Sequence, residues 1–216
     1  MTTSFHQIAK RPLAIRRASQ ITALALIVTV ATQLLYVASG ALGVTPDRAI
    51  VWGLEVLAFL TVAIFGLALV PARPVAGAGV AMGGVLNVIQ AGMGLVMFGP
   101  LGDAGEAMAP AFQAVLAGAF LLYFAGKAAF ALAGLQLGVE LWQSASGGIR
   151  FLGLAAVITG GIGLVLNLVM TFGGMQVSLG GMGLLFPAGG AGTAATLFLA
   201  LILTASIDRA DAPTSA

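Results

Sequence analysis

Two charged side chains, Glu55 and Lys127, lie within otherwise apolar stretches of the sequence. A carboxyl group in such a stretch can exchange a proton or bind a cation, and an ammonium group can rest against the face of an aromatic ring. Placing a charge in membrane hydrocarbon costs at least about 2.5 kcal/mol, so such residues are rare and commonly functional. Glu55 and Lys127 are therefore the first candidates for chemistry.

Side-chain amides accompany Glu55 at similar distances from the outer ends of their predicted helices. At ~1.5 Å per residue, Glu55 lies about 10 Å below the outer surface, and several amides lie about 10–13 Å below it. The amides are those of Gln33, Gln90, Asn167, the shallower Gln113 and the deeper Asn87. Carboxamides both donate and accept hydrogen bonds, so they can surround a carboxylate or bind a polar solute. The pattern predicts either a ligand site open toward the outer side or hydrogen bonds that only join helices.

Lys127 is predicted to lie apart from this layer. Counted from Pro110, it lies about 25 Å from the outer edge and about 15 Å deeper than Glu55, which argues against a direct salt bridge between them. Aromatic residues share its helical face: Phe120, Tyr123, Phe124 and Phe130. The main expectation is that Lys127 extends to the cytoplasmic head groups. A buried amine or a cation–π site, with Tyr123 and Phe124 as ligand-binding candidates beside Lys127, is the second interpretation.

Six long apolar stretches must position these residues. Hydrophobic residues make up 60% of the 216-residue chain and charged residues 7%, whereas a soluble domain has roughly 25% charged residues. About 20 apolar residues span a bilayer, so we predict an all-α integral membrane protein with six transmembrane helices. The expected spans are 21–39, 49–70, 75–98, 109–136, 151–172 and 187–206, within a membrane domain of residues 21–206.

The distribution of basic residues predicts the orientation. With the N-terminus inside, the cytoplasmic segments hold seven Lys and Arg residues, and the opposite side holds only Arg48. This asymmetry follows the positive-inside rule and places both termini in the cytoplasm. We therefore expect a basic cytoplasmic tail at 1–20 and a short cytoplasmic tail at 207–216. The expected location is the inner membrane of a bacterial cell.

Several function classes lack their usual residues. The chain has no cysteine and one histidine, so no metal site or cofactor is predicted. It has no basic patch with interleaved aromatic residues, and we expect no nucleic-acid partner. No P-loop, serine elbow or HExxH motif is present. The sequence therefore assigns no catalytic residue and favours a non-enzymatic role, although enzymatic activity stays open.

Glycine spacing bears on helix packing. Gly79 and Gly83 form a GxxxG step, and glycines also cluster at 160–163. Small residues let helices approach closely, either within the chain or in contact with a membrane-protein partner or a second copy. A faint repeat at an offset of 77 residues, which aligns 83–84 with 160–161, suggests repeated helical hairpins. The uncharged, glycine-rich loop before Pro187 either dips back into the membrane or forms an apolar surface loop.

The sequence thus leaves two functions open. The first is transport or binding of a small solute or ion through an outer-facing polar site around Glu55. The alternative is a non-catalytic structural or assembly subunit of a larger membrane complex. In either case the lipid bilayer is the expected surrounding partner. The identity of any solute is not predicted.

Overall fold

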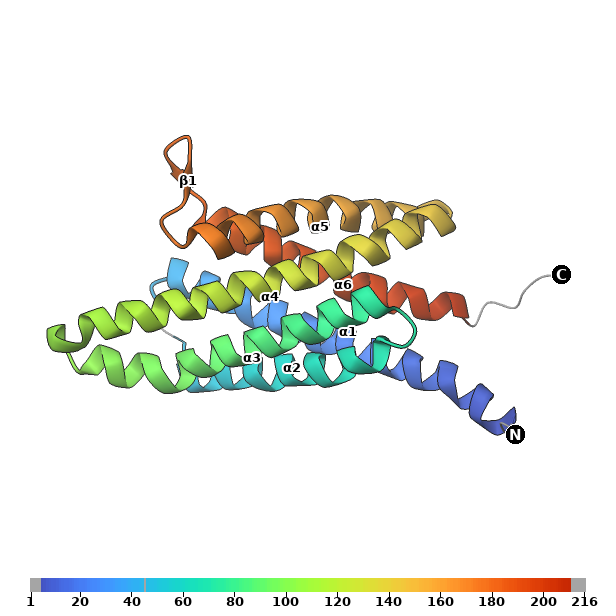
Figure 1. The fold of residues 1–216 in the computed structure, drawn as a ribbon, viewed down its shortest axis with the longest axis horizontal. Helices are drawn as coiled ribbons and strands as arrows, with labels where there is room; N and C mark the ends of the chain where they lie inside the picture. The colour runs from blue at the N-terminus through green and yellow to red at the C-terminus, as the bar shows by residue number, and fades with distance from the viewer. Residues whose placement is uncertain (1–4, 45, 211–216) are drawn as a thin grey trace.

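The computed structural model describes residues 5–44 and 46–210. Six long helices run side by side, and a small β-hairpin projects from one end of the bundle (Figure 1). The helices are α1 (Phe5–Ala41), α2 (Arg48–Leu69), α3 (Pro74–Asp103), α4 (Ala109–Ser144), α5 (Gly147–Gly173) and α6 (Leu185–Ala210). A short 3-10 turn, η1 (Glu106–Met108), precedes α4, and the hairpin strands are β1 (Ser178–Leu179) and β2 (Met182–Gly183). All six helices are long and apolar enough to cross a membrane, which confirms the predicted fold class.

The helix ends explain where the chain turns. Asp47 caps α2, because its carboxylate accepts hydrogen bonds from the backbone N–H groups of Ala49 and Ile50 at 2.8 and 3.3 Å. Pro74 occupies the first turn of α3, where its missing N–H costs nothing.

We call the end that holds the 70–73 and 145–146 connections the termini end, because α1 begins and α6 ends there (Figure 1). The opposite end, which carries the β-hairpin, is the hairpin end.

Several predicted boundaries differ from the structure. α1 already begins at Phe5, so most of the predicted tail 1–20 is helical. α4 continues to Ser144, eight residues beyond its predicted end at 136, and only 145–146 separate it from α5. The glycine-rich loop before α6 is an exposed hairpin in which Leu179 pairs with Met182, so it does not dip into the membrane domain. Residues 1–4 and 211–216 of the two predicted tails lie outside the described residues, and the orientation stays a prediction.

The central helices are longer than a bilayer requires. α3 has 30 residues and α4 has 36, which corresponds to about 45 and 54 Å of helix, whereas the hydrocarbon core is about 30 Å thick. Their shared turn lies farther out than the other connections at the hairpin end (Figure 1). Distances counted from Pro110 therefore overstate how deeply a residue of α4 lies in the membrane.

The helices close into a ring of α1, α2, α3, α4 and α6, with α5 packed outside against α4 and α6. Glycines allow the closest approaches. A Cβ atom on Gly84 would lie 2.6 Å from the backbone nitrogen of Ala63, so α2 and α3 meet at backbone contact. A Cβ atom on Gly79 would lie 2.8 Å from the carbonyl oxygen of Ala129, so α3 and α4 are also in backbone contact. These contacts agree with the close packing predicted for the glycine-rich spans.

Substitution of Gly84 by alanine tests the α2–α3 contact. We expect Gly84→Ala to destabilise the protein by about 1–3 kcal/mol, because overpacking forces backbones apart, and to lower the apparent melting temperature of the purified protein in detergent. Gly92→Ala is the matched control on the same helix, because nothing lies within 4 Å of its added Cβ. Equal melting temperatures for the two variants would contradict the close approach of α2 and α3.

Candidate functional site

Lys127 lies in the centre of the bundle and is fully buried, with 0% of its surface exposed. Its Nζ atom donates hydrogen bonds to Gln33 Oε1 at 2.8 Å and to Thr196 Oγ1 at 3.3 Å. The same Nζ atom lies 5.5 Å from the centre of the Tyr123 ring, which is within the range of a cation–π contact. The ammonium group of α4 is thus held by polar groups from α1 and α6.

Two of the three N–H donors of the Lys127 ammonium group have acceptors among the described residues. Gln33 Oε1 has two lone pairs, and it accepts a second hydrogen bond from Thr193 Oγ1 at 3.0 Å. Thr196 uses its own proton in a 2.7 Å hydrogen bond to the carbonyl oxygen of Gly192, so its lone pairs face Lys127. Gln33 and Thr196 therefore both present lone pairs to the ammonium group of Lys127.

Glu55 is also buried, with 7% of its surface exposed. Its Oε1 atom lies 3.0 Å from Thr32 Oγ1, and Thr32 Oγ1 lies 2.9 Å from the carbonyl oxygen of Thr29. A hydroxyl group has one proton and cannot donate fully to both acceptors. Thr32 either donates to an ionised Glu55, or donates to Thr29 while a protonated Glu55 donates to Thr32. The site thus has a consistent arrangement for each protonation state of Glu55.

Helix α1 links the two charges. Thr32 contacts Glu55 and the next residue, Gln33, contacts Lys127, so the two charged groups meet α1 at successive positions. Glu55 and Lys127 interact electrostatically, but they form no direct ion pair within 4 Å among the described residues. We call Thr32, Gln33, Glu55, Lys127, Thr193 and Thr196 the buried polar cluster.

The depth argument that was given against a direct salt bridge was wrong. Lys127 does not extend to head groups, because its ammonium group bonds to Gln33 and Thr196 inside the bundle. The depth difference from Glu55 was overestimated because the counting placed Pro110 at the outer edge, whereas the α3–α4 turn lies farther out than the other connections at the hairpin end (Figure 1). Lys127 belongs instead to the level of the membrane that Gln33 occupies.

The other predicted amides do not converge on Glu55. Asn167 donates to the carbonyl oxygens of Gly163 and Ala188 at 2.7 and 3.1 Å, and Asn87 donates to that of Gly83 at 2.8 Å. The Oδ1 atoms of both asparagines are buried and have no hydrogen-bond partner among the described residues. Gln90 is half-buried, and Gln113 is exposed on α4. No hydrogen bond joins any of these four side chains to Glu55 in the described part of the chain.

The predicted aromatic face divides into separate contacts. Tyr123 lies against Lys127, whereas Phe124 stacks on Phe120 at 5.9 Å between ring centres and packs with Met170. Phe130 stacks on Phe59 of α2 at 6.1 Å. Of the predicted aromatic residues, Tyr123 is thus the one that contacts the ammonium group.

Sequence reasoning missed three threonines, Thr32, Thr193 and Thr196. Threonine is a common residue in membrane helices and usually bonds to its own helix backbone, so its type alone gives no signal. A usable signal lies in two matching segments, Gly126-Lys127-Ala128-Ala129 and Gly192-Thr193-Ala194-Ala195. The second residue of each, Lys127 or Thr193, donates to Gln33 Oε1.

A second pair of matching segments bears on the predicted repeat. Residues 83–87 read GGVLN and residues 163–167 read GLVLN, an offset of 80 rather than 77. In each, the asparagine donates to the carbonyl oxygen of the glycine four residues earlier. Asn87 packs against Gly126, and Asn167 packs against Gly192. The contacts favour the 80-residue register, and duplication of the hairpins stays a prediction.

Comparisons with models of protein families, with curated proteins and with solved structures returned no match.

Replacement of Gln33 tests its role as the acceptor for Lys127. We expect Gln33→Leu to destabilise the protein by about 1.5–3 kcal/mol, because a buried charge loses a hydrogen bond, with a lower apparent melting temperature in detergent. Gln113→Leu is the control, because Gln113 is exposed on α4 and its change should have little effect.

The double variant Gln33→Leu/Lys127→Met makes the test specific. Removing the charge as well as its acceptor should recover part of the lost stability, since no unpaired ammonium remains. The single variant Lys127→Met completes the comparison. If the double variant loses as much stability as Gln33→Leu and Lys127→Met lose together, a direct Gln33–Lys127 interaction is contradicted.

Proposed function

We propose that this multi-pass membrane protein is a carrier of a small monovalent anion, which it takes up together with a proton at the buried polar cluster. The proposal rests on one observation, the full burial of the Lys127 ammonium group beside a carboxyl group that it does not contact directly. Amide and hydroxyl groups would join the helices at lower cost than two ionisable groups. The presence of both charges is therefore better explained by binding than by packing.

Charge balance indicates the class of solute. With Glu55 ionised and Lys127 protonated, the site carries no net charge and needs no ligand. When Glu55 takes up a proton, Lys127 is left as an uncompensated cation in an apolar surrounding, which is strongly unfavourable unless an anion binds. The two arrangements available to Thr32 support this exchange, because each accommodates one protonation state of Glu55.

The position of the cluster supports access from the hairpin end. Glu55 lies seven residues after the first residue of α2, and this corresponds to about 10 Å of helix. In the orientation predicted by the basic residues, the hairpin end faces away from the cytoplasm. The solute would then enter from the outer side of the membrane, which in this proposal is the bacterial inner membrane.

Anion-dependent thermal stabilisation tests the proposal. Purified protein would be heated with sodium formate, acetate, lactate or nitrate, at pH 5 and pH 8, against sodium gluconate at equal ionic strength. A ligand at 100 times its Kd stabilises by about 2.7 kcal/mol, so we expect one of the small anions to raise the melting temperature by several degrees. The increase should be larger at pH 5, because the anion-bound state holds one more proton, on Glu55.

Two variants connect the effect to the cluster. Lys127→Met should abolish the stabilisation, and Glu55→Gln, which is uncharged at both pH values, should retain it without pH dependence. If Lys127→Met does not fold, the Glu55→Gln result alone decides the proton coupling. Equal melting temperatures in all salts for the wild-type protein would overturn the carrier proposal and favour the structural or assembly subunit.

A further inference from the structure

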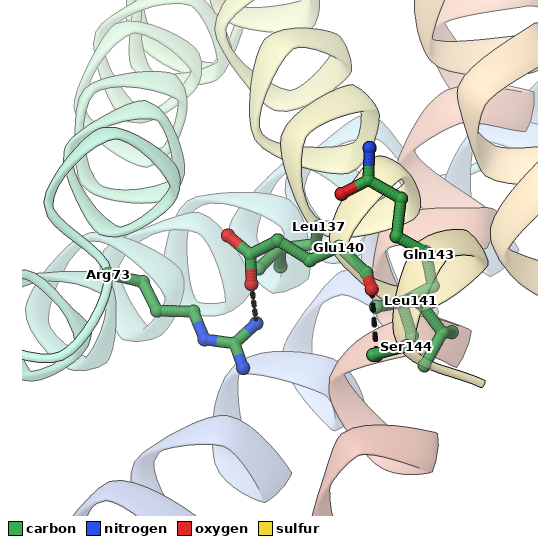
Figure 2. A pocket seen from close by; sticks show the side chains of 7 residues that line it. Arg73, Leu137, Glu140, Leu141, Gln143 and Ser144 are labelled. Atoms are coloured by element: carbon green, nitrogen blue, oxygen red, sulfur yellow. Dashed lines mark hydrogen bonds and ion pairs between the residues drawn. The ribbon is translucent and has the colours of Figure 1, made fainter.

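A second polar site lies at the termini end, away from the buried polar cluster. A pocket of about 490 Å³ opens there (Figure 2). It is bounded by the α2–α3 turn, by the last turns of α4, and by α6. Arg73 and Glu140 form its charged side, Gln143 adds a carboxamide, and Leu137, Leu141 and Ile202 form its apolar side. The pocket therefore combines opposite charges with an apolar wall.

The charges in this pocket form a direct ion pair that remains accessible. Arg73 Nη1 lies 2.6 Å from Glu140 Oε2, and the two side chains are 43% and 41% exposed. Gln136 Nε2 donates to the other carboxylate oxygen, Glu140 Oε1, at 3.2 Å. A guanidinium group has five N–H donors and each carboxylate oxygen has two lone pairs, so both groups can bind further partners on their exposed sides.

The setting of the pocket is that of lipid head groups. It lies where α4 ends and where α2 turns into α3, at the edge of the apolar spans. Trp142 on the same turn of α4 is 39% exposed, and exposed tryptophan is typical of the membrane–water interface. The apolar side chains of Leu137 and Ile202 can cover the glycerol and upper acyl carbons of a lipid.

We propose that this pocket binds the head group of a zwitterionic phospholipid with a primary amine, as in phosphatidylethanolamine. Arg73 donates to the phosphate, which accepts paired hydrogen bonds from a guanidinium group. Glu140 accepts from the ammonium group, with Gln143 beside it. An anionic lipid without an amine would leave Glu140 near its phosphate, and a quaternary amine has no N–H to donate. The geometry thus selects the primary amine over both.

Native mass spectrometry of the full-length protein with equimolar phosphatidylethanolamine, phosphatidylcholine and phosphatidylglycerol of identical acyl chains tests this site. We expect the ethanolamine lipid to be retained about tenfold more than either competitor. This ratio corresponds to the free energy of one charge-assisted hydrogen bond. Glu140→Gln should bring the ethanolamine-to-glycerol ratio close to one. Arg73→Gln should lower retention of all three lipids.

Arg150→Gln is the control, because Arg150 lies in the first turn of α5 near the same end but does not line the pocket, and it should keep the preference. If Arg73→Gln does not fold, Glu140→Gln and Arg150→Gln still decide the outcome. Water-soluble glycerophosphoethanolamine should not displace the lipid, since it cannot use the apolar wall. Each of three results would overturn the proposal. The wild type could retain the three lipids equally, or Glu140→Gln and Arg150→Gln could give the same ethanolamine-to-glycerol ratio. The third is displacement of the bound lipid by the soluble head group.

Discussion

The burial of one positive charge constrains the rest of this structure. An ammonium group in the middle of a helical bundle must keep its hydrogen bonds and must have a compensating charge nearby, because the surroundings solvate it poorly. Lys127 meets the first condition through Gln33 and Thr196, and meets the second through its electrostatic interaction with Glu55. Helices α1, α2 and α6 are thereby brought to the same side of α4. The ring of helices is the arrangement that lets the side chains of Gln33, Glu55, Lys127 and Thr196 reach one centre.

Much of the fold could be predicted from the sequence because hydropathy reports directly on the bilayer. The six spans follow from apolar length alone, and the close approach of α3 to α4 follows from the GxxxG step of Gly79 and Gly83. The extent of α4 could not be predicted in this way. Its last turns, at 137–144, contain both apolar and polar residues, and hydropathy does not distinguish a helix from a loop in such a mixed segment.

The candidate site was predicted less completely, for a related reason. Glu55, Gln33 and Lys127 were identified because polar groups stand out in apolar helices. Their partners depended on helix rotation and on how far the α3–α4 turn projects past the other connections at the hairpin end, and residue counting gives neither. Gln113 was therefore grouped with Gln33 although it lies exposed, and Lys127 was separated from the residue to which it bonds at 2.8 Å.

The glycine contacts also distinguish α1 from the other five helices. Backbone contacts at Gly84, Gly79 and Gly160 fasten α2 to α3, α3 to α4 and α4 to α5, and Gly163 brings α5 close to α6. No such contact involves a glycine of α1 in the described part of the chain: a Cβ atom on Gly40 would meet nothing within 4 Å. A shift of α1 against the other five helices would therefore break no glycine contact of this kind among the described residues. Because α1 carries both Thr32 and Gln33, such a shift would release Glu55 and Lys127 in the same movement.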